Sequence, residues 1–183
     1  MGKNSKRSWF RFSLKTLLVL MTALAIWLGL YAKSFRDRRD AIAEVKLLDG
    51  SISLKYDGPA WLRRLVRDET YFWNPIAVRF TGPHRLTDIE LQKIMKQLLS
   101  FQDLNYLMLA NSQITNAGLE QLLPLRDNLE TIDISGTDIS DEGIVHLKRF
   151  SKLTLLRIQH TNVTPNGVVE LQQSLPSCKI LVD

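Results

Sequence analysis

Hydrophobic residues recur at a nearly constant spacing in the second half of the chain. Each copy has four of them, and three successive copies are Leu104, Leu107, Leu109 and Ile114, then Leu129, Ile132, Ile134 and Ile139, then Leu153, Leu156, Ile158 and Val163. Equivalent positions are 24 or 25 residues apart. A repeat of this length is typical of a solenoid in which every copy supplies one strand and one short helix, and buries its apolar face only against its neighbours.

Each copy combines a strand pattern with a helix pattern. In the LxxLxL run the leucines point into the solenoid, because alternate side chains of a strand face opposite sides of the sheet. Thr115, Ser140 and Thr164 then precede helical runs as N-caps, and Thr87 with Glu90 forms the capping box of an earlier copy. We therefore predict an α/β fold over residues 76–183, a short right-handed leucine-rich repeat solenoid with a parallel concave sheet and convex helices.

The segment 33–75 is expected to hold a juxtamembrane helix and an N-terminal cap. Apolar residues at helical spacing predict a helix up to Leu48, period-two alternation predicts a strand over 51–56, and a short basic helix is expected over 60–66. Four aromatic residues are assigned to the core of the cap, with an exposed aromatic platform as the alternative: Trp61, Tyr71, Phe72 and Trp73.

The first 15 residues form a basic tail, and residues 16–32 carry no charge. As a helix this uncharged run measures about 26 Å, close to the roughly 30 Å of a bilayer core once Leu14 and snorkelling Lys15 and Lys33 are added. We predict a signal-anchor transmembrane helix over 16–32, with residues 1–15 in the cytoplasm and the repeats outside it, because the tail has no acidic residue. Cleavage as a signal peptide, followed by secretion, is the alternative.

The charge distribution argues against a nucleic-acid partner. The net charge is +5, but residues 1–40 hold nine basic and two acidic residues, whereas the remainder holds 15 basic and 17 acidic ones. The basicity therefore belongs to the N-terminal segment and not to the repeats. Cys178 is the only cysteine, which excludes an intrachain disulfide and a cysteine-rich metal site.

We predict no catalytic, metal or cofactor site and no enzymatic activity. The histidines, His84, His146 and His160, fall at unrelated repeat positions, and no nucleophile, metal-binding or phosphate-loop motif is present. The most acidic stretch, Asp133 to Glu142, lacks the residue order of a calcium loop.

The residues between the leucines form the candidate binding surface, because they face the concave side. This protein-binding set consists of Arg79, Tyr106, Met108, Asn111, Thr131, Asp133, Leu155, Arg157, Gln159 and His160. Its mixture of aromatic, flexible apolar and charged side chains is typical of protein interfaces. Alternatively, Asp133 and Arg157 pair with each other across adjacent strands.

The turns Ile114 to Leu119 and Ile139 to Ile144 resemble leucine-rich repeats of the cysteine-containing, F-box-associated type, with Ser or Thr where Cys is common. The wider layout, from Phe10 to Leu18 into the apolar segment and then Gly58 to Leu62, resembles a large group of membrane-anchored bacterial leucine-rich repeat proteins typical of planctomycetes. The resemblance covers nearly the whole chain. It implies the fold and says little about function.

Two functions are consistent with this pattern. The first is a membrane-anchored, non-catalytic module whose repeats bind another protein. The second is a structural cell-envelope component that self-associates, for example through the edge of a last strand near Ile180 to Val182.

Overall fold

The computed structural model describes residues 14–58, 60, 73–80 and 86–182. The chain divides into two compact units, residues 1–36 and residues 37–183. The helix α1, Leu14–Leu47, begins in the first unit and ends in the second. The second unit contains the sheet and all of the other helices that the structure describes.

In the first unit, the described side chains of α1 are exposed, among them those of Leu18, Leu24 and Ile26. No helix within the described residues is long and apolar enough to cross a membrane. This finding contradicts the predicted transmembrane helix over 16–32, and with it the single-pass localisation that places the repeats outside the cytoplasm. The uncharged run measures about 26 Å, less than the roughly 30 Å core, and reaching that length required counting the charged Lys15 and Lys33.

The second unit is built on a six-stranded sheet whose strands lie in chain order. The strands are β1 (Gly50–Tyr56), β2 (Trp73–Phe80), β3 (Tyr106–Met108), β4 (Thr131–Asp133), β5 (Leu155–Arg157) and β6 (Lys179–Leu181). Strands β2 to β6 are parallel, but β1 pairs with β2 in antiparallel orientation. The sheet is therefore mixed, which corrects the predicted parallel sheet. The antiparallel β1 covers the edge of β2 that would otherwise expose unpaired backbone groups.

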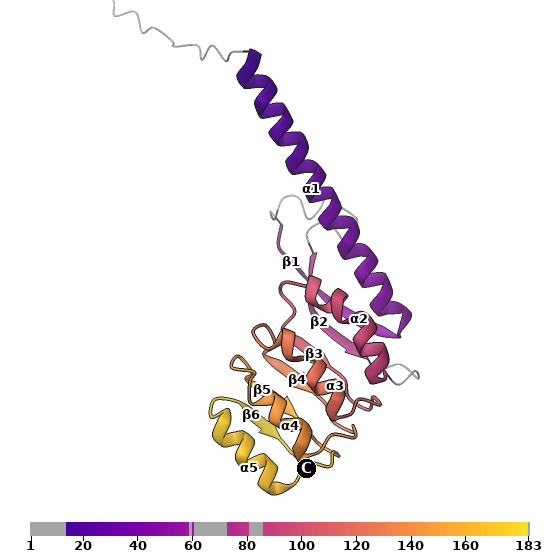
Figure 1. The fold of residues 1–183 in the computed structure, drawn as a ribbon, viewed down its shortest axis with the longest axis vertical. Coiled ribbons are helices and arrows are strands. Elements are labelled where there is room, and N and C mark those ends of the chain that lie inside the picture. The colour runs from indigo at the N-terminus through magenta and orange to yellow at the C-terminus, as the bar shows by residue number, and fades with distance from the viewer. Residues whose placement is uncertain (1–13, 59, 61–72, 81–85, 183) are drawn as a thin grey trace, which may run out of the picture. The chain divides into compact units, whose positions relative to one another are not determined.

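Helices follow the parallel strands and stack in the same order (Figure 1). They are α2 (Asp88–Ser100), α3 (Asn116–Gln121) with the 3-10 turn η2 (Leu123–Leu125), α4 (Asp141–Leu147) and α5 (Pro165–Ser174). The apolar core lies between sheet and helices, where Leu107, Ile132 and Leu156 from the strands are fully buried together with Leu119 and Leu171 from the helices. The alternating strand-helix repeat predicted from the 24- to 25-residue spacing is confirmed.

The helix N-termini are capped mostly as the sequence predicts. Thr87 accepts a hydrogen bond from the Glu90 backbone N–H at 3.4 Å, and the Glu90 carboxylate accepts one from the Thr87 N–H at 2.9 Å, which completes the capping box. Thr115 and Thr164 also cap their helices with side-chain oxygens. Ser140 does not, because its hydroxyl instead accepts a hydrogen bond from the Asn116 side chain at 2.9 Å.

A ladder of side-chain hydrogen bonds joins each helix start to the next. The first residue of one helix bonds both the backbone N–H and the hydroxyl of the N-cap residue in the following repeat, in the pairs Asp88 with Thr115, Asn116 with Ser140 and Asp141 with Thr164. The side-chain oxygens of Asp88, Asn116 and Asp141 lie where a Cβ would project from Gly118, Gly143 and Gly167. We call this arrangement the N-cap ladder. It explains why the third residue of α3, α4 and α5 is a glycine, since each of these helices packs against the first residue of the helix before it.

The turn after each strand shows a second recurring contact. Thr137 and Thr161 donate hydrogen bonds to the carbonyls of Ile134 and Ile158 at 2.5 and 2.7 Å. The hydroxyl of Ser112, at the equivalent position, is buried without a hydrogen-bond partner among the described residues. The hydroxyl position therefore stabilises the turn in two of the three repeats.

At the N-terminal side of the sheet, α1 contributes Ala41, Ile42 and Val45 to the core of the second unit. Trp73 packs edge-on against Tyr56, with ring centroids 5.4 Å apart. The other predicted cap aromatics, Trp61, Tyr71 and Phe72, lie outside the described residues, as does the predicted helix over 60–66 apart from Ala60.

Candidate functional site

The parallel strand register builds two lines of side chains on the sheet face opposite the helices. One line consists of Ala77, Tyr106, Thr131, Leu155 and Lys179, and the other of Arg79, Met108, Asp133, Arg157 and Leu181. We call these lines the concave rows. Neighbouring strands lie about 4.8 Å apart, so each row extends over about 19 Å. Seven of the ten predicted binding residues lie in these rows.

Contacts within the second row tie several of these side chains together. Arg157 Nη1 lies 3.5 Å from Asp133 Oδ2, and the Asp133 side chain is only 11% exposed, against 42% for Arg157. The other carboxylate oxygen of Asp133 accepts a hydrogen bond from the Ser135 N–H at 3.0 Å. Arg79 Nε donates to Met108 Sδ at 3.0 Å. Asp133 therefore pairs across neighbouring strands and holds Arg157 at the surface.

The solvent-facing part of the rows excludes Thr131 and Asp133, which are buried. Arg79 and Lys179 are exposed, and the remaining members are half-buried, namely Ala77, Tyr106, Met108, Leu155, Arg157 and Leu181. This surface carries more positive than negative charge, because its acidic residue, Asp133, is covered and already paired. It offers aromatic, thioether, aliphatic and guanidinium groups to a partner.

The three other predicted binding residues lie in the turns that follow the strands. Asn111 and His160 have positive φ angles of 59° and 54°, like Gly136 at the same repeat position with 67°. Asn111 Oδ1 occupies the space that a Cβ on Gly136 would need, at 2.4 Å. Asn tolerates the left-handed region better than most residues, and His is also enriched there. These positions are explained by turn geometry, and Gln159 lies half-buried beside His160.

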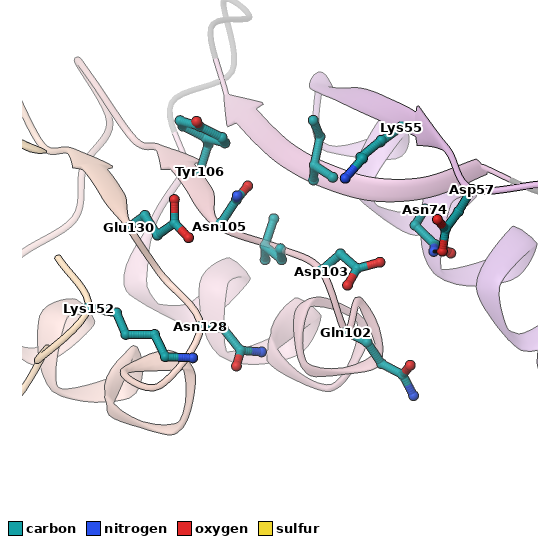
Figure 2. Close-up of a pocket in the computed structure, with 12 residues that line it drawn as sticks. Lys55, Asp57, Asn74, Gln102, Asp103, Asn105, Tyr106, Asn128, Glu130 and Lys152 are labelled. Carbon is teal, nitrogen blue, oxygen red and sulfur yellow. Dashed lines mark hydrogen bonds between the residues drawn. The ribbon is translucent and has the colours of Figure 1, made fainter. Parts of the chain in front are cut away.

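A cleft of about 550 Å³ opens at the end of the sheet where the parallel strands β3, β4 and β5 begin. Its walls come from β1, β2 and the segments that precede β3, β4 and β5 (Figure 2). The lining is strongly polar and consists of Lys55, Asp57, Asn74, Ile76, Gln102, Asp103, Leu104, Asn105, Tyr106, Asn128, Glu130 and Lys152. Tyr106 is shared with the concave rows, so the cleft borders them.

The repeat register arranges the cleft residues in lines as well. Asn105 and Glu130 each precede a paired strand residue, so they occupy equivalent places in neighbouring repeats. Asp103, Asn128 and Lys152 each precede the first leucine of a repeat and form a second line. In Figure 2, Asn105 and Glu130 lie next to each other near Tyr106, whereas Lys55 and Asn74 come from the β1–β2 side.

Hydrogen bonds fix one wall of the cleft. Arg38 Nη1 donates to Asn74 Oδ1 at 2.6 Å, and Asn74 Nδ2 donates to Asp57 Oδ2 at 3.4 Å. Asn74 and Asp57 are thereby engaged within the protein. These hydrogen bonds hold the wall in place, and the groups that form them are not free to bind a ligand.

The middle of the cleft holds acceptors with no partner. Neither Asp103 nor Glu130 has a side-chain hydrogen bond or an ion pair among the described residues. The amide oxygen of Asn105 is buried and receives no hydrogen bond there. A buried acceptor left unsatisfied costs about 1–3 kcal/mol. Asp103 is exposed and Glu130 half-buried, so water reaches both carboxylates, and the unsatisfied acceptor of the cleft lining is the buried Asn105 oxygen.

Sequence reasoning missed this cleft. It concentrated on residues between the strand leucines, whereas the cleft uses the polar residues that flank the first leucine of each repeat, as in Asp103-Leu104-Asn105 and Asn128-Leu129-Glu130. That recurring polar-leucine-polar pattern was the available signal. No sequence signal places Lys55 and Asn74 in the cleft lining, because their position depends on the pairing of β1 with β2.

Metal-binding and nucleophilic groups do not gather in the described part of the chain. It contains no group of three His, Cys, Asp or Glu residues arranged to hold a metal ion, and the cleft lining includes neither histidine nor cysteine. Cys178 is buried, and desolvation raises the pKa of its thiol. A protonated, buried thiol is a poor nucleophile.

Comparisons with known proteins agree with the repeat architecture. A family model described as leucine-rich repeat matches residues 128–147, which include β4 and α4. The match covers one strand-helix unit, and the other units of the array have the same strand-helix order. No curated protein sequence matches the chain significantly.

Two solved structures are similar to part of the chain. The first is the leiomodin-1 actin-binding site 2, with 16% identity and a TM-score of 0.49, covering 59% of this chain and 70% of that one. The second is a structure of the Chaetomium Mex67:Mtr2 subunits, with 21% identity and a TM-score of 0.46, covering 58% of this chain and 78% of that one.

Proposed function

We propose that this leucine-rich repeat chain is a non-catalytic module that binds another protein through its concave rows. The observation that carries the proposal is that half-exposed Tyr106 and Met108 on β3 and half-exposed Leu155 and Arg157 on β5 lie in the same two rows, on either side of β4. Aromatic residues, Met and Arg are the residue types enriched in protein interfaces. The rigid strand ladder presents them without a large loss of side-chain and backbone entropy on binding.

The pairing within the rows also supports this proposal. The buried Asp133 carboxylate restrains Arg157, and the Arg79 side chain is held against Met108. Side chains that are already ordered lose less conformational freedom when a partner docks.

As a further proposal, which leaves the membrane anchor aside, the chain comes from planctomycete bacteria, whose leucine-rich repeat proteins its sequence resembles.

The experiment that tests the function places a photo-crosslinking amino acid at Leu155 in the full-length chain. The matched control carries the same group at Val145, which is 52% exposed on α4 on the helical side. We expect a protein adduct of defined mass from position 155 and none from position 145. Equal adducts from both positions, or none from position 155, would contradict binding through the concave rows.

A substitution then checks the specificity of the adduct. Arg157→Ala removes a half-exposed guanidinium from the rows, and we expect it to lower the adduct yield at position 155 at least about fivefold, the effect of losing about 1 kcal/mol of binding energy. Arg149→Ala, an exposed arginine after α4, is the matched control and should leave the yield unchanged. Circular dichroism verifies that both variants are folded.

A second proposal is self-association through β6, which ends the strand order and pairs on one side with β5. An open edge favours the addition of another strand. The exposed Lys179 and the length of only three residues oppose it. Light scattering on the full-length chain tests this: a dimer that dissociates on Ile180→Pro supports it, and a monomer contradicts it.

A further inference from the structure

The two arginines of the second concave row lean towards the middle strands from opposite sides. Arg79 on β2 reaches β3, where its Nε lies 3.0 Å from Met108 Sδ. Arg157 on β5 reaches β4, where its Nη1 lies 3.5 Å from Asp133 Oδ2. We propose that these two guanidinium groups bind an acidic, extended segment of the protein partner that carries two carboxylates two residues apart. This inference rests on the proposed function, because it names the chemistry of the partner that occupies the concave rows.

Most N–H donors of both guanidinium groups remain available. Arg79 is exposed, donates to a thioether, which is a weak acceptor, and takes part in no ion pair among the described residues. Arg157 contacts Asp133 through one nitrogen, at the long distance of 3.5 Å, and its side chain is 42% exposed. A guanidinium group carries five N–H donors in a planar fork that matches a carboxylate. Each arginine can therefore pair with an incoming carboxylate by charge-assisted hydrogen bonds.

The charges of the concave rows do not balance. Three cations are accessible, namely Arg79, Arg157 and Lys179. The carboxylate of the rows belongs to Asp133, whose side chain is only 11% exposed and already engaged by Arg157 and a backbone N–H. Glu130 lies three residues before Asp133 along the chain, about 10 Å from the second row at the rise of a strand. The second row therefore keeps an excess of positive charge that carboxylates of a partner would compensate.

The spacing of the two arginines favours an extended segment with alternate carboxylates. Because Arg79 reaches β3 and Arg157 reaches β4, their guanidinium groups are about one to two strand steps apart, or about 5–10 Å. Side chains two residues apart in an extended chain lie on the same face, about 6.7 Å from each other. Side chains of adjacent residues point to opposite faces, so only one of two adjacent carboxylates would reach the row.

A short acidic segment fits this surface better than nucleic acid does. Residues 41–183 hold 15 basic and 17 acidic residues, so the cations of the rows form a local patch on a body with net negative charge. Nucleic-acid binding depends on many phosphate contacts and on a broad positive surface. Half-buried Tyr106, Met108 and Leu155 lie in the same rows and can contact apolar side chains of a peptide.

The test uses nitrogen-15-labelled full-length chain and three blocked heptapeptides built from alanine, serine and glutamate. The first peptide has two glutamates separated by one alanine, the second has the same composition with the glutamates adjacent, and the third replaces both glutamates of the first with glutamine. We expect the first peptide to shift the amide signals of Met108 and Arg157. It should bind at least about threefold more tightly than the second and at least about tenfold more tightly than the third, and its affinity should fall as salt is added.

Two variants complete the test. Arg79→Gln removes one guanidinium group and should weaken binding of the first peptide at least about fivefold, and more at low salt than at high salt. Arg149→Gln, at an exposed position directly after α4, is the matched control and should bind within about twofold of the unmodified chain. The dispersion of the amide signals verifies that both variants are folded.

Each other outcome overturns the inference. Equal binding of the glutamine peptide removes the role of the carboxylates, equal binding of the two glutamate peptides removes the role of their spacing, and unchanged binding by Arg79→Gln removes the role of that arginine. An octathymidylate strand that shifts the same amides and binds more tightly than the first peptide assigns the surface to nucleic acid instead. A retained protein adduct at position 155 without any preference for the acidic peptide would contradict this inference alone, whereas a missing adduct contradicts the proposed function.

Discussion

At the scale of single residues, side chains act differently according to the neighbour that the fold supplies. Asn116 and Asp141 occupy the same place at the start of successive helices, and each bonds the next N-cap residue twice. Asn116 donates to the Ser140 hydroxyl, whereas the Asp141 carboxylate accepts from the Thr164 hydroxyl at 2.6 Å. One ladder position therefore works with either an amide or a carboxylate, but only the carboxylate titrates.

The pKa of Asp141 leads to a prediction of pH dependence. Hydrogen bonds from the Thr164 side chain and then from its backbone hold this pKa below the ordinary 3.8 and outweigh desolvation. A lowered folded-state pKa means stability that is present above the unfolded pKa and is lost as the pH falls through the folded one. We expect the stability advantage of the unmodified chain over Asp141→Asn to shrink steadily as the pH falls from 5 towards 2.

Urea unfolding of both chains across that pH range measures this advantage. Asp127→Asn is the control, because this surface carboxylate pairs only at 3.6 Å with Arg126 and its side chain is 70% exposed. The control should show a smaller change with pH. A stability difference for Asp141→Asn that stays constant with pH would refute the role of its hydrogen bonds to Thr164.

At the scale of elements, the N-cap ladder fixes how closely successive helices approach. A Cβ on Gly143 would lie 2.4 Å from Asn116 Oδ1 and 3.2 Å from the Asn116 Cα, so part of the contact is with backbone that does not easily move. Glycine is required here by the neighbouring repeat and not by its own backbone conformation, since the positive φ angles lie elsewhere among the described residues.

Gly143→Ala should therefore destabilise the chain by about 1–3 kcal/mol, the usual cost of overpacking, despite the better helix propensity of alanine. In an Asn116→Ala background the clash with the amide is removed, and the cost should fall by at least about 0.5 kcal/mol, which is measurable in a double-mutant cycle. Gly29→Ala is the control, because a Cβ there meets nothing within 4 Å. Strict additivity would show that the glycine and the amide do not compete for space.

At the scale of the whole molecule, the described repeats form a linear array in which each contacts its neighbours. The helices pair in the order α2, α3, α4 and α5, and the strands in the order β1 to β6. A central repeat is therefore supported from two sides and the last one from a single side. Damage to a central repeat should be transmitted in both directions along the array.

Ile132→Ala tests this, since Ile132 is fully buried at the centre of β4. We expect a loss of about 2–5 kcal/mol in the free energy of unfolding, and faster hydrogen exchange in both β3 and β5. Leu171→Ala, equally buried but in α5, should accelerate exchange mainly in β5 and β6. A loss below about 0.5 kcal/mol for Ile132→Ala, the level of a surface substitution, would contradict the role of this position in the core.

The sequence by itself determined the repeat, because its 24- to 25-residue spacing and its alternation of apolar and polar positions are local consequences of strand and helix periodicity. Ile132 and Leu156 were predicted in the core and are fully buried, and the capping box of Thr87 and Glu90 is present. The placement of Tyr106, Thr131 and Leu155 between the inward leucines also followed from repeat register alone. Periodicity therefore defined which residues are equivalent.

Only the tertiary structure decided what those equivalent residues contact. The antiparallel direction of β1 depends on its pairing with β2, and the cleft forms only once that pair and the following repeats are assembled. The turn positions of Asn111 and His160 and the burial of Asp133 depend likewise on neighbouring side chains. The physical reason is that periodicity acts within one element, whereas burial, pairing and unsatisfied acceptors arise between elements that are distant in the sequence.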